Sequence, residues 1–101
     1  MSMQSLGSLL PALLRDLGLE QATQGWRAVT DWPTVVGPRL AAHTRASSFH
    51  EGIMTIEVEG SAWMHELGFL KRELVRRMND HLGAPIVREV RFIPARGGNL
   101  R

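Results

Sequence analysis

The chain has 101 residues, of which 44% are hydrophobic and 22% charged, a composition typical of one compact globular domain and not of a disordered or fibrous chain. It contains no cysteine, which excludes disulfide frameworks, thiolate zinc sites and cysteine nucleophiles and favours a cytoplasmic location. The net charge of +2 hides an asymmetry, because residues 1–70 hold four arginines against seven carboxylates, whereas residues 71–101 hold eight cations against three carboxylates.

The first half of the chain predicts helices. Leucines at helical spacing predict a first helix over residues 5–17, which Gly18 ends. A second helical stretch begins near Glu20 and runs to about Thr30. We expect it to break at Trp32-Pro33 and to continue from residue 34 to residue 43, because proline lacks the amide proton that a helix interior uses.

The second half predicts a hairpin, a long helix and a last strand. Residues 46–50 and 53–59 flank Glu51-Gly52, and the second run alternates apolar and polar residues, as a strand buried on one face does. Ser61 then begins an amphipathic helix to Leu82, ended by Gly83, and residues 86–93 supply a third strand. The expected fold is α+β in the order ααββαβ, with helices packed on one face of a small three-stranded sheet. Residues 1–93 form one domain, and 94–101 form a short, flexible, basic tail.

The predicted helix over residues 61–82 has two different sides. One side carries the stripe expected in the core, made of Trp63, Leu67, Leu70, Leu74 and Met78. The other side collects His65, Phe69, Arg72, Arg76 and Asn79. An aromatic ring among arginines can stack on an unpaired base while the guanidinium groups hold phosphates. The alternative is that Phe69 packs under a loop or a neighbouring helix and has no binding role, since single apolar residues at a protein surface are common.

The remaining candidate cations lie at the C-terminal end. Arg88 falls in the apolar column of the last strand and is therefore an edge residue or displaced by a bulge, and Arg91 faces the other side. With Arg96, these residues extend a phosphate-binding track or serve only as solubilising charges. The candidate nucleic-acid-binding residues are therefore His65, Phe69, Arg72, Arg76, Arg88, Arg91 and Arg96.

The motifs of enzymes, metal sites and membrane spans are missing from the sequence. The four histidines have no metal-ligand spacing, and there is no glycine-rich phosphate loop, nucleophile elbow or paired-carboxylate site. No apolar run approaches the ~20 residues that a membrane span needs. We expect a protein without catalytic activity, cofactor, metal, small-molecule substrate or membrane partner.

Three segments together resemble the DciA family. They are Trp-Pro-Thr-Val-Val-Gly-Pro-Arg-Leu-Ala-Ala-His-Thr at 32–44, Gly-Ile-Met-Thr-Ile-Glu-Val at 52–58 and Ser-Ala-Trp-Met-His-Glu-Leu at 61–67, and the resemblance extends over residues 5–93. It implies a KH-like domain in a bacterial protein that binds nucleic acid and the DnaB-type replicative helicase, without catalytic activity or cofactor. The sequence lacks the G-x-x-G clamp by which typical KH domains hold four nucleotides.

The leading hypothesis is therefore a DNA-replication accessory protein that helps to load or operate the helicase and binds single-stranded or tailed DNA. One alternative is a KH-like protein that binds RNA, and another is an adaptor that binds only proteins. Salt separates the last from the other two, because phosphate contacts make affinity fall steeply with salt concentration.

Overall fold

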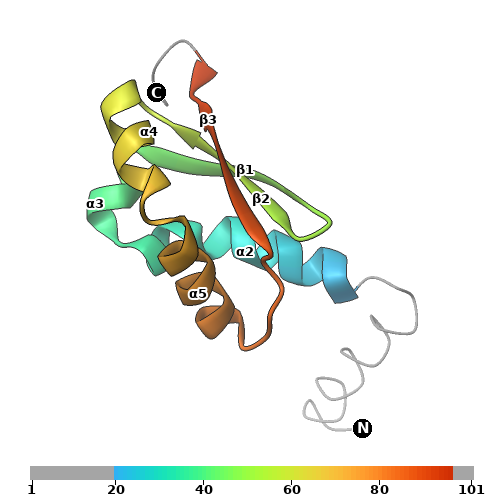
Figure 1. Ribbon diagram of the computed structural model, residues 1–101. Helices are drawn as coiled ribbons and strands as arrows, with labels where there is room; N and C mark the ends of the chain where they lie inside the picture. The colour runs from blue at the N-terminus through green and yellow to red at the C-terminus, as the bar shows by residue number, and fades with distance from the viewer. Residues whose placement is uncertain (1–19, 97–101) are drawn as a thin grey trace, which may run out of the picture.

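The computed structural model describes residues 20–96, with side-chain detail from Thr23 onward. The helix predicted over 5–17 and residues 97–101 of the predicted tail lie outside the described residues. The elements, in chain order, are α2 (Glu20–Val36), α3 (Pro38–Ala41), β1 (Thr44–His50), β2 (Ile53–Val58), α4 (Ser61–Gly68), α5 (Lys71–Leu82) and β3 (Glu89–Pro94) (Figure 1).

The three strands form one sheet in the order β1-β2-β3. β1 and β2 are antiparallel, and a two-residue turn separates the paired residues His50 and Ile53. Glu51 and Gly52 in that turn have φ of 50° and 85°, the left-handed conformations that a tight hairpin needs. β3 runs parallel to β2, and α4 and α5 provide the crossover between them. The predicted hairpin is confirmed, and its first strand begins two residues earlier than expected.

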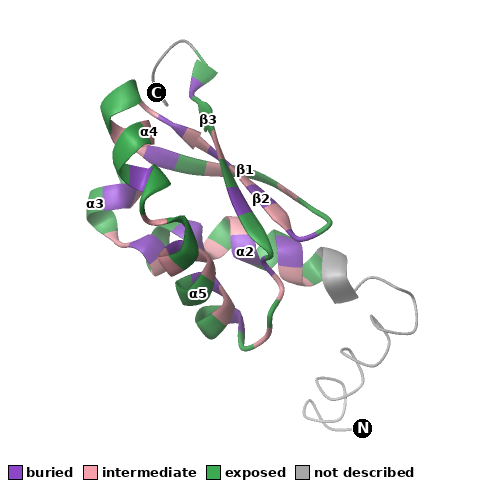
Figure 2. Cartoon of the chain, in the orientation of Figure 1, coloured by how far each residue is buried: buried purple, intermediate pink, exposed green. Residues whose placement is uncertain are grey.

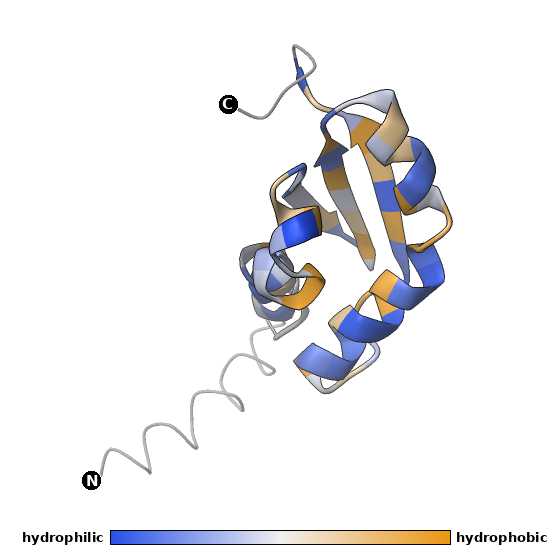
Figure 3. Ribbon diagram, turned by 90° about the vertical axis from the view of Figure 1, so that its left-hand side faces the viewer, coloured by the Kyte–Doolittle hydropathy of each residue, from blue (hydrophilic) through white to orange (hydrophobic). Residues whose placement is uncertain are grey.

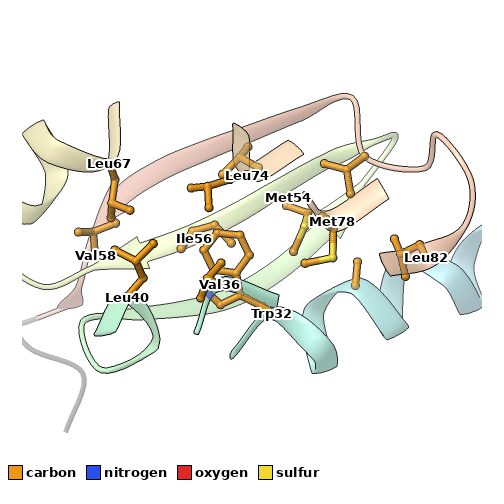
Figure 4. Close-up of a cluster of buried hydrophobic side chains, with 13 residues drawn as sticks. Trp32, Val36, Leu40, Met54, Ile56, Val58, Leu67, Leu74, Met78 and Leu82 are labelled. Carbon is orange, nitrogen blue, oxygen red and sulfur yellow. The ribbon is translucent and has the colours of Figure 1, made fainter. Parts of the chain in front are cut away.

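The core lies on one face of the sheet. Met54, Ile56 and Val58 of β2 are at most 1% exposed, whereas the residues between them are half-buried, as the alternation predicted. Figure 2 shows the buried residues gathered where the helices meet the strands. Figure 4 shows Trp32 of α2 and Leu74 of α5 on either side of Ile56, so that α2 and α5 share one core with the sheet.

The break in the second helix was predicted at the wrong residue. α2 continues through Pro33 to Val36 and ends at Gly37, whose φ of 87° is costly for any residue with a Cβ. Pro38 then starts α3. Packing explains the continuation, because the indole of Trp32 is fully buried and its Nε1 donates a 2.9 Å hydrogen bond to Thr44 Oγ1. This anchor holds the helix on the sheet across the proline.

The predicted helix over residues 61–82 is two helices. α4 ends at Gly68, Phe69 and Leu70 form a turn, and α5 begins at Lys71. The predicted core stripe is correct for Leu67, Leu74 and Met78, but Trp63 and Leu70 are only half-buried. Because the turn interrupts the helix, the spacing of buried residues in α4 does not continue into α5.

The last strand begins later than predicted, at Glu89 instead of Ile86. The connection before it is held by Asn79, whose side chain donates to Val87 O at 2.9 Å and accepts from Val87 N at 2.8 Å. Asn79 is therefore half-buried and not on the exposed face where it was expected. The α+β class and the KH-like arrangement of helices on a three-stranded sheet are confirmed.

Candidate nucleic-acid interface

The turn between α4 and α5 presents an aromatic ring to solvent. It reads Gly68-Phe69-Leu70-Lys71, and its backbone is fixed by hydrogen bonds from Phe69 N to Glu66 O and from Leu70 N to Leu67 O. Phe69 is 78% exposed. Its only ring contact among the described residues is an edge-on contact with His65, with the ring centroids 5.1 Å apart. One face of a phenyl ring is therefore available for stacking.

The first turn of α5 adds positive charge beside this ring. The N-cap residue, Leu70, makes no side-chain capping hydrogen bond, and the backbone amides that open a helix lack intrahelical acceptors. These amides carry the positive end of the helix dipole. Lys71 and Arg72, both exposed, lie on this turn. Stacking surface, amide donors and cations thus meet within four residues.

The ion pairs show which cations already have a carboxylate partner and which are available to bind a phosphate. Within residues 23–96, Arg27, Arg39, Arg45, Arg76 and Arg77 each lie within 4.0 Å of a carboxylate. The cations of the same range without a carboxylate partner are Lys71, Arg72, Arg88, Arg91 and Arg96. All five belong to the basic C-terminal third. The local positive field therefore comes from α5's first turn and from β3 with its flanks.

Arg76, one of the candidate residues, is held by two carboxylates. Its guanidinium lies 2.6 Å from Glu73 Oε1 and 3.0 Å from Asp80 Oδ2. The hydrogen bond from Arg76, followed by that from Arg77, holds the pKa of the Glu73 carboxyl below its ordinary value. The hydrogen bond to Glu73 in turn raises the pKa of Arg76. A phosphate that binds Arg76 has to compete with these carboxylates.

The arginines around β3 do not form one cluster. Arg88 precedes the strand, and the stem of its side chain covers Gly52, where an added Cβ would lie 2.6 Å from Arg88 Cδ. Arg88 is thus neither in the apolar column nor displaced by a bulge. Arg96 follows the other end of the six-residue strand, which is about 20 Å long. Arg91 pairs with Thr55 and projects from the open face of the sheet, as predicted.

The structure therefore brings together His65, Phe69 and Arg72 of the candidate residues. It places Arg76 in an ion-pair cluster on the next turn of α5 and spreads Arg88, Arg91 and Arg96 along β3 and beyond its ends. In Figure 3 most of the ribbon of α5 has the colour of hydrophilic residues. The sequence pattern located the exposed ring and cations but not the turn that joins them.

Lys71 is a functional candidate that the sequence pattern missed. Its ammonium lies 5.6 Å from the centre of the Phe92 ring, which ties the first turn of α5 to β3. Its position beside Arg72 at a helix start becomes visible only once residues 61–82 are divided into two helices.

A second aromatic cluster joins two of the resembling segments. The ring of Trp63 stacks on His43, with the ring centroids 4.3 Å apart. The guanidinium of Arg39 lies 5.1 Å from the centre of the Trp63 ring and also donates a hydrogen bond to Glu66. His43 Nδ1 is buried without a well-formed hydrogen bond, 3.5 Å from Glu59 Oε1. Trp63 thus packs at the edge of the core and connects α3 to α4.

The part of the chain that the structure describes also contains an apolar pocket. A pocket of about 320 Å³ lies between the start of α4 and the end of β3, with a lining that carries no charged side chain: Val58, Gly60, Ser61, Met64, Pro94 and Ala95. Across residues 20–96, no three histidine or acidic side chains gather in a way that would hold a metal ion. No helix in this range has the length and apolar character needed to cross a membrane.

Comparison with known proteins identifies the family. The family model described as "Dna[CI] antecedent, DciA" matches residues 5–92. The chain belongs to the DciA family. Among curated relatives, a UPF0232 protein of Streptomyces avermitilis is 30% identical over 99 residues, which cover 96% of this chain and 54% of the relative. UPF0232 proteins of Mycolicibacterium smegmatis and Corynebacterium glutamicum are each 26% identical, over 92% and 88% of this chain.

This DciA-family chain spans about half the length of these relatives, since the matches cover 50–54% of each. The matched region contains all the described elements except the end of β3 and the residues after it. The family relationship thus applies to the KH-like domain itself, including the turn between α4 and α5.

Proposed function

We propose that this DciA-family protein is a non-catalytic DNA-replication accessory protein that binds DNA and a DnaB-type replicative helicase and assists loading or operation of the helicase. Membership of the family supports the helicase link. The observation that supports DNA binding is the α4–α5 turn, where an exposed phenyl ring adjoins Lys71 and Arg72 at an uncapped helix start.

The arrangement favours single-stranded or tailed DNA as the ligand. A ring that stands out from the surface stacks on a base only where that base is unpaired, and cations beside it hold the adjoining phosphates. Because stacking surfaces and charges do not distinguish base edges, binding is expected to tolerate different sequences. Without a nucleotide-binding motif, assistance to the helicase draws on binding energy alone.

The test compares two arginines that differ in their partners. Arg72 has no carboxylate partner among residues 23–96, whereas Arg45 lies 2.7 Å from Glu57 Oε2. The affinity of each alanine variant for a fluorescent tailed DNA is measured by anisotropy at several salt concentrations. Arg72→Ala should reduce the slope of log K against log salt by about 0.7, the value of one phosphate contact on a single strand. Arg45→Ala should leave the slope unchanged.

The partner is tested in the same assay. Addition of the cognate DnaB-type helicase should produce a ternary complex, and the wild-type protein should speed capture of the tailed DNA by the helicase. Tighter binding to RNA than to DNA of the same sequence would replace the proposal with an RNA-binding function. Helicase binding without any salt-dependent binding of nucleic acid would leave a protein-binding adaptor.

A further inference from the structure

The sheet has two outer edges, and they differ in regularity. β1 ends the sheet on one side, and its pairing with β2 shifts at a bulge between Ala46 and Ser48. A bulge of this kind twists an edge strand and hinders its pairing with a further strand. β3 ends the sheet on the other side and keeps one register with β2 over its whole length (Figure 1). The outer side of β3 is therefore the edge that is able to accept a further strand.

Two hydrogen bonds show which backbone groups of β3 face this outer side. The N–H of Glu89 donates to the carbonyl of the residue before β2 at 3.2 Å, and the N–H of Ala95 donates to the carbonyl of the last residue of β2 at 2.9 Å. Backbone groups alternate in direction along a strand, so the N–H and C=O groups of Val90 and Phe92 point away from β2. Outside the β2–β3 ladder, no backbone carbonyl of the described residues accepts a hydrogen bond from either N–H. These four groups are a template for strand addition.

A second copy of β3 fits this edge poorly. In an antiparallel pair of two copies, one register joins Val90 of each copy to Phe92 of the other, and it places the two Arg91 side chains directly opposite each other, where like charges destabilise the pair. One neighbouring register brings Val90 opposite Pro94, which has no N–H. The other brings Phe92 opposite Arg88, whose N–H already donates to a carbonyl of the hairpin turn at 2.7 Å. The edge therefore favours a strand of different sequence.

The side chains beside the edge indicate the chemistry of that strand. Arg91 projects from the open face of the sheet, is exposed and has no carboxylate partner among residues 23–96. An acidic side chain opposite Arg91 would form a favourable cross-strand pair, whereas Glu89 on the same face disfavours a second acid opposite itself. On the other face Val90 is buried and Phe92 is half-buried, which favours apolar neighbours.

The apolar pocket between the start of α4 and the end of β3 supplies an anchor point at the same edge. Pro94 and Ala95 form its β3 side, and Met64 lines it from α4. Because Pro94 has no N–H, an added strand stops pairing there, and its next apolar side chain faces the pocket. We propose that the edge of β3 binds an extended segment of a partner protein through the backbone of Val90 and Phe92. The segment carries a carboxylate beside Arg91 and an apolar side chain in the pocket. This site does not use the ring and cations of the α4–α5 turn.

Amide hydrogen exchange in the full chain tests whether the edge is free. The N–H groups of Arg91 and Ile93 face β2 and should exchange slowly. Those of Val90 and Phe92 face away from β2 and should exchange fast. Slow exchange of all four amides would overturn the proposal, because the edge would then already be covered.

The binding test uses the synthetic peptide acetyl-Leu-Thr-Val-Glu-Val-Lys-amide. Aligned antiparallel to β3, its two valines pair with Phe92 and Val90, its glutamate lies beside Arg91, and its leucine faces the pocket. Saturable amide shifts and slowed exchange are expected at Val90 and Phe92. The same peptide with both valines N-methylated keeps every side chain but loses the N–H donors, and it should not bind. Equal binding of the two peptides, or no saturable change at these amides, would overturn strand addition.

A charge exchange tests the contact with Arg91. A lysine in place of the peptide's glutamate should raise the Kd for the wild-type protein about 1.5- to 5-fold, the effect of one cross-strand charge pair. Arg91→Glu should restore the affinity for this lysine peptide, whereas Arg27→Glu on α2 should not. Equal effects of the two variants would contradict the proposed contact. A serine in place of the peptide's leucine should weaken binding, and unchanged affinity would contradict the role of the pocket.

The same amides identify other occupants of the edge. Protection of Val90 and Phe92 by oligothymidine but not by the peptide would assign the edge to nucleic acid. Protection that grows with the concentration of the protein alone would assign it to a second copy. Either result would overturn the proposal, and neither depends on whether Phe69 and Arg72 bind DNA.

Discussion

Removal of the Phe69 ring should weaken DNA binding without weakening the fold. The side chain is 78% exposed and contacts only the edge of His65 among the described rings. Substitution at such a position changes the free energy of unfolding by about 0.5 kcal/mol or less. Stacking of a base on an aromatic side chain contributes about 1–3 kcal/mol, so Phe69→Ala should raise the Kd for a single strand about 5- to 150-fold.

The assay is anisotropy of a fluorescent oligothymidine, supported by a thermal melt. Because a phenyl ring releases no counterions, Phe69→Ala should lower the affinity at every salt concentration and leave the salt slope unchanged. Phe69→Trp should retain the affinity. Trp26→Ala is the matched control, since Trp26 is similarly exposed, at 72%, but lies on α2. Wild-type affinity in Phe69→Ala, or an equal loss in Trp26→Ala, would refute stacking at the turn.

Three further predictions concern stability and charge. Thr44→Val should lower the free energy of unfolding by about 1–3 kcal/mol in urea titrations, because it leaves the buried Trp32 indole N–H unpaired. The control Ser48→Ala, on the exposed side of β1, should have little effect on the same free energy. Gly37→Ala should destabilise the protein by about 1–2 kcal/mol because φ at Gly37 is 87°. Gly68 has ordinary helical backbone and open space around it, so Gly68→Ala should stabilise the protein by about 0.4–1 kcal/mol. Equal effects of the two substitutions in a thermal melt would contradict this reasoning. Glu73→Gln should tighten DNA binding in anisotropy measurements, because it removes the carboxylate that holds Arg77 and one of the two that hold Arg76. Unchanged affinity would show that these arginines lie outside the interface.

The same carboxylate gives a pH dependence with a defined sign. The pKa of Glu73 is lowered in the folded protein, so its stabilising contribution is complete above its ordinary pKa of 4.5. That contribution is lost as pH falls through the lower folded-state value. Glu73→Gln should therefore flatten the acid side of a plot of unfolding free energy against pH, and an unchanged slope would contradict the assignment.

Local patterns predicted the sheet well. The alternation along β2 and the Glu51-Gly52 turn depend on neighbouring residues, and both are observed where expected. The break before α3 was misplaced because the burial of Trp32, a tertiary contact, outweighs the local preference of Pro33. Sequence rules place helix ends at proline, but a helix packed against a sheet can lose one hydrogen bond and continue.

The candidate interface was predicted only in its parts. Phe69 and Arg72 were recognised because their periodicity opposes the core stripe, and both are exposed. The division of residues 61–82 into α4 and α5 was missed, because leucines at 67, 70 and 74 satisfy the spacing of an uninterrupted helix. The sequence also does not show which carboxylates pair with each arginine. Arg72 and Arg76 look equivalent in the sequence, and only the structure shows that Arg76 forms ion pairs with Glu73 and Asp80.

The most direct measurement is an NMR titration of the wild-type protein with unlabelled oligothymidine, in which the amide shifts of all residues are followed together. Binding through the α4–α5 turn predicts saturable shifts centred on residues 65–72 and smaller shifts around Lys71's neighbour Phe92, with the hairpin turn at residues 51–52 unaffected. Shifts concentrated elsewhere, or none at concentrations where anisotropy reports binding, would contradict the assignment of this turn as the nucleic-acid interface.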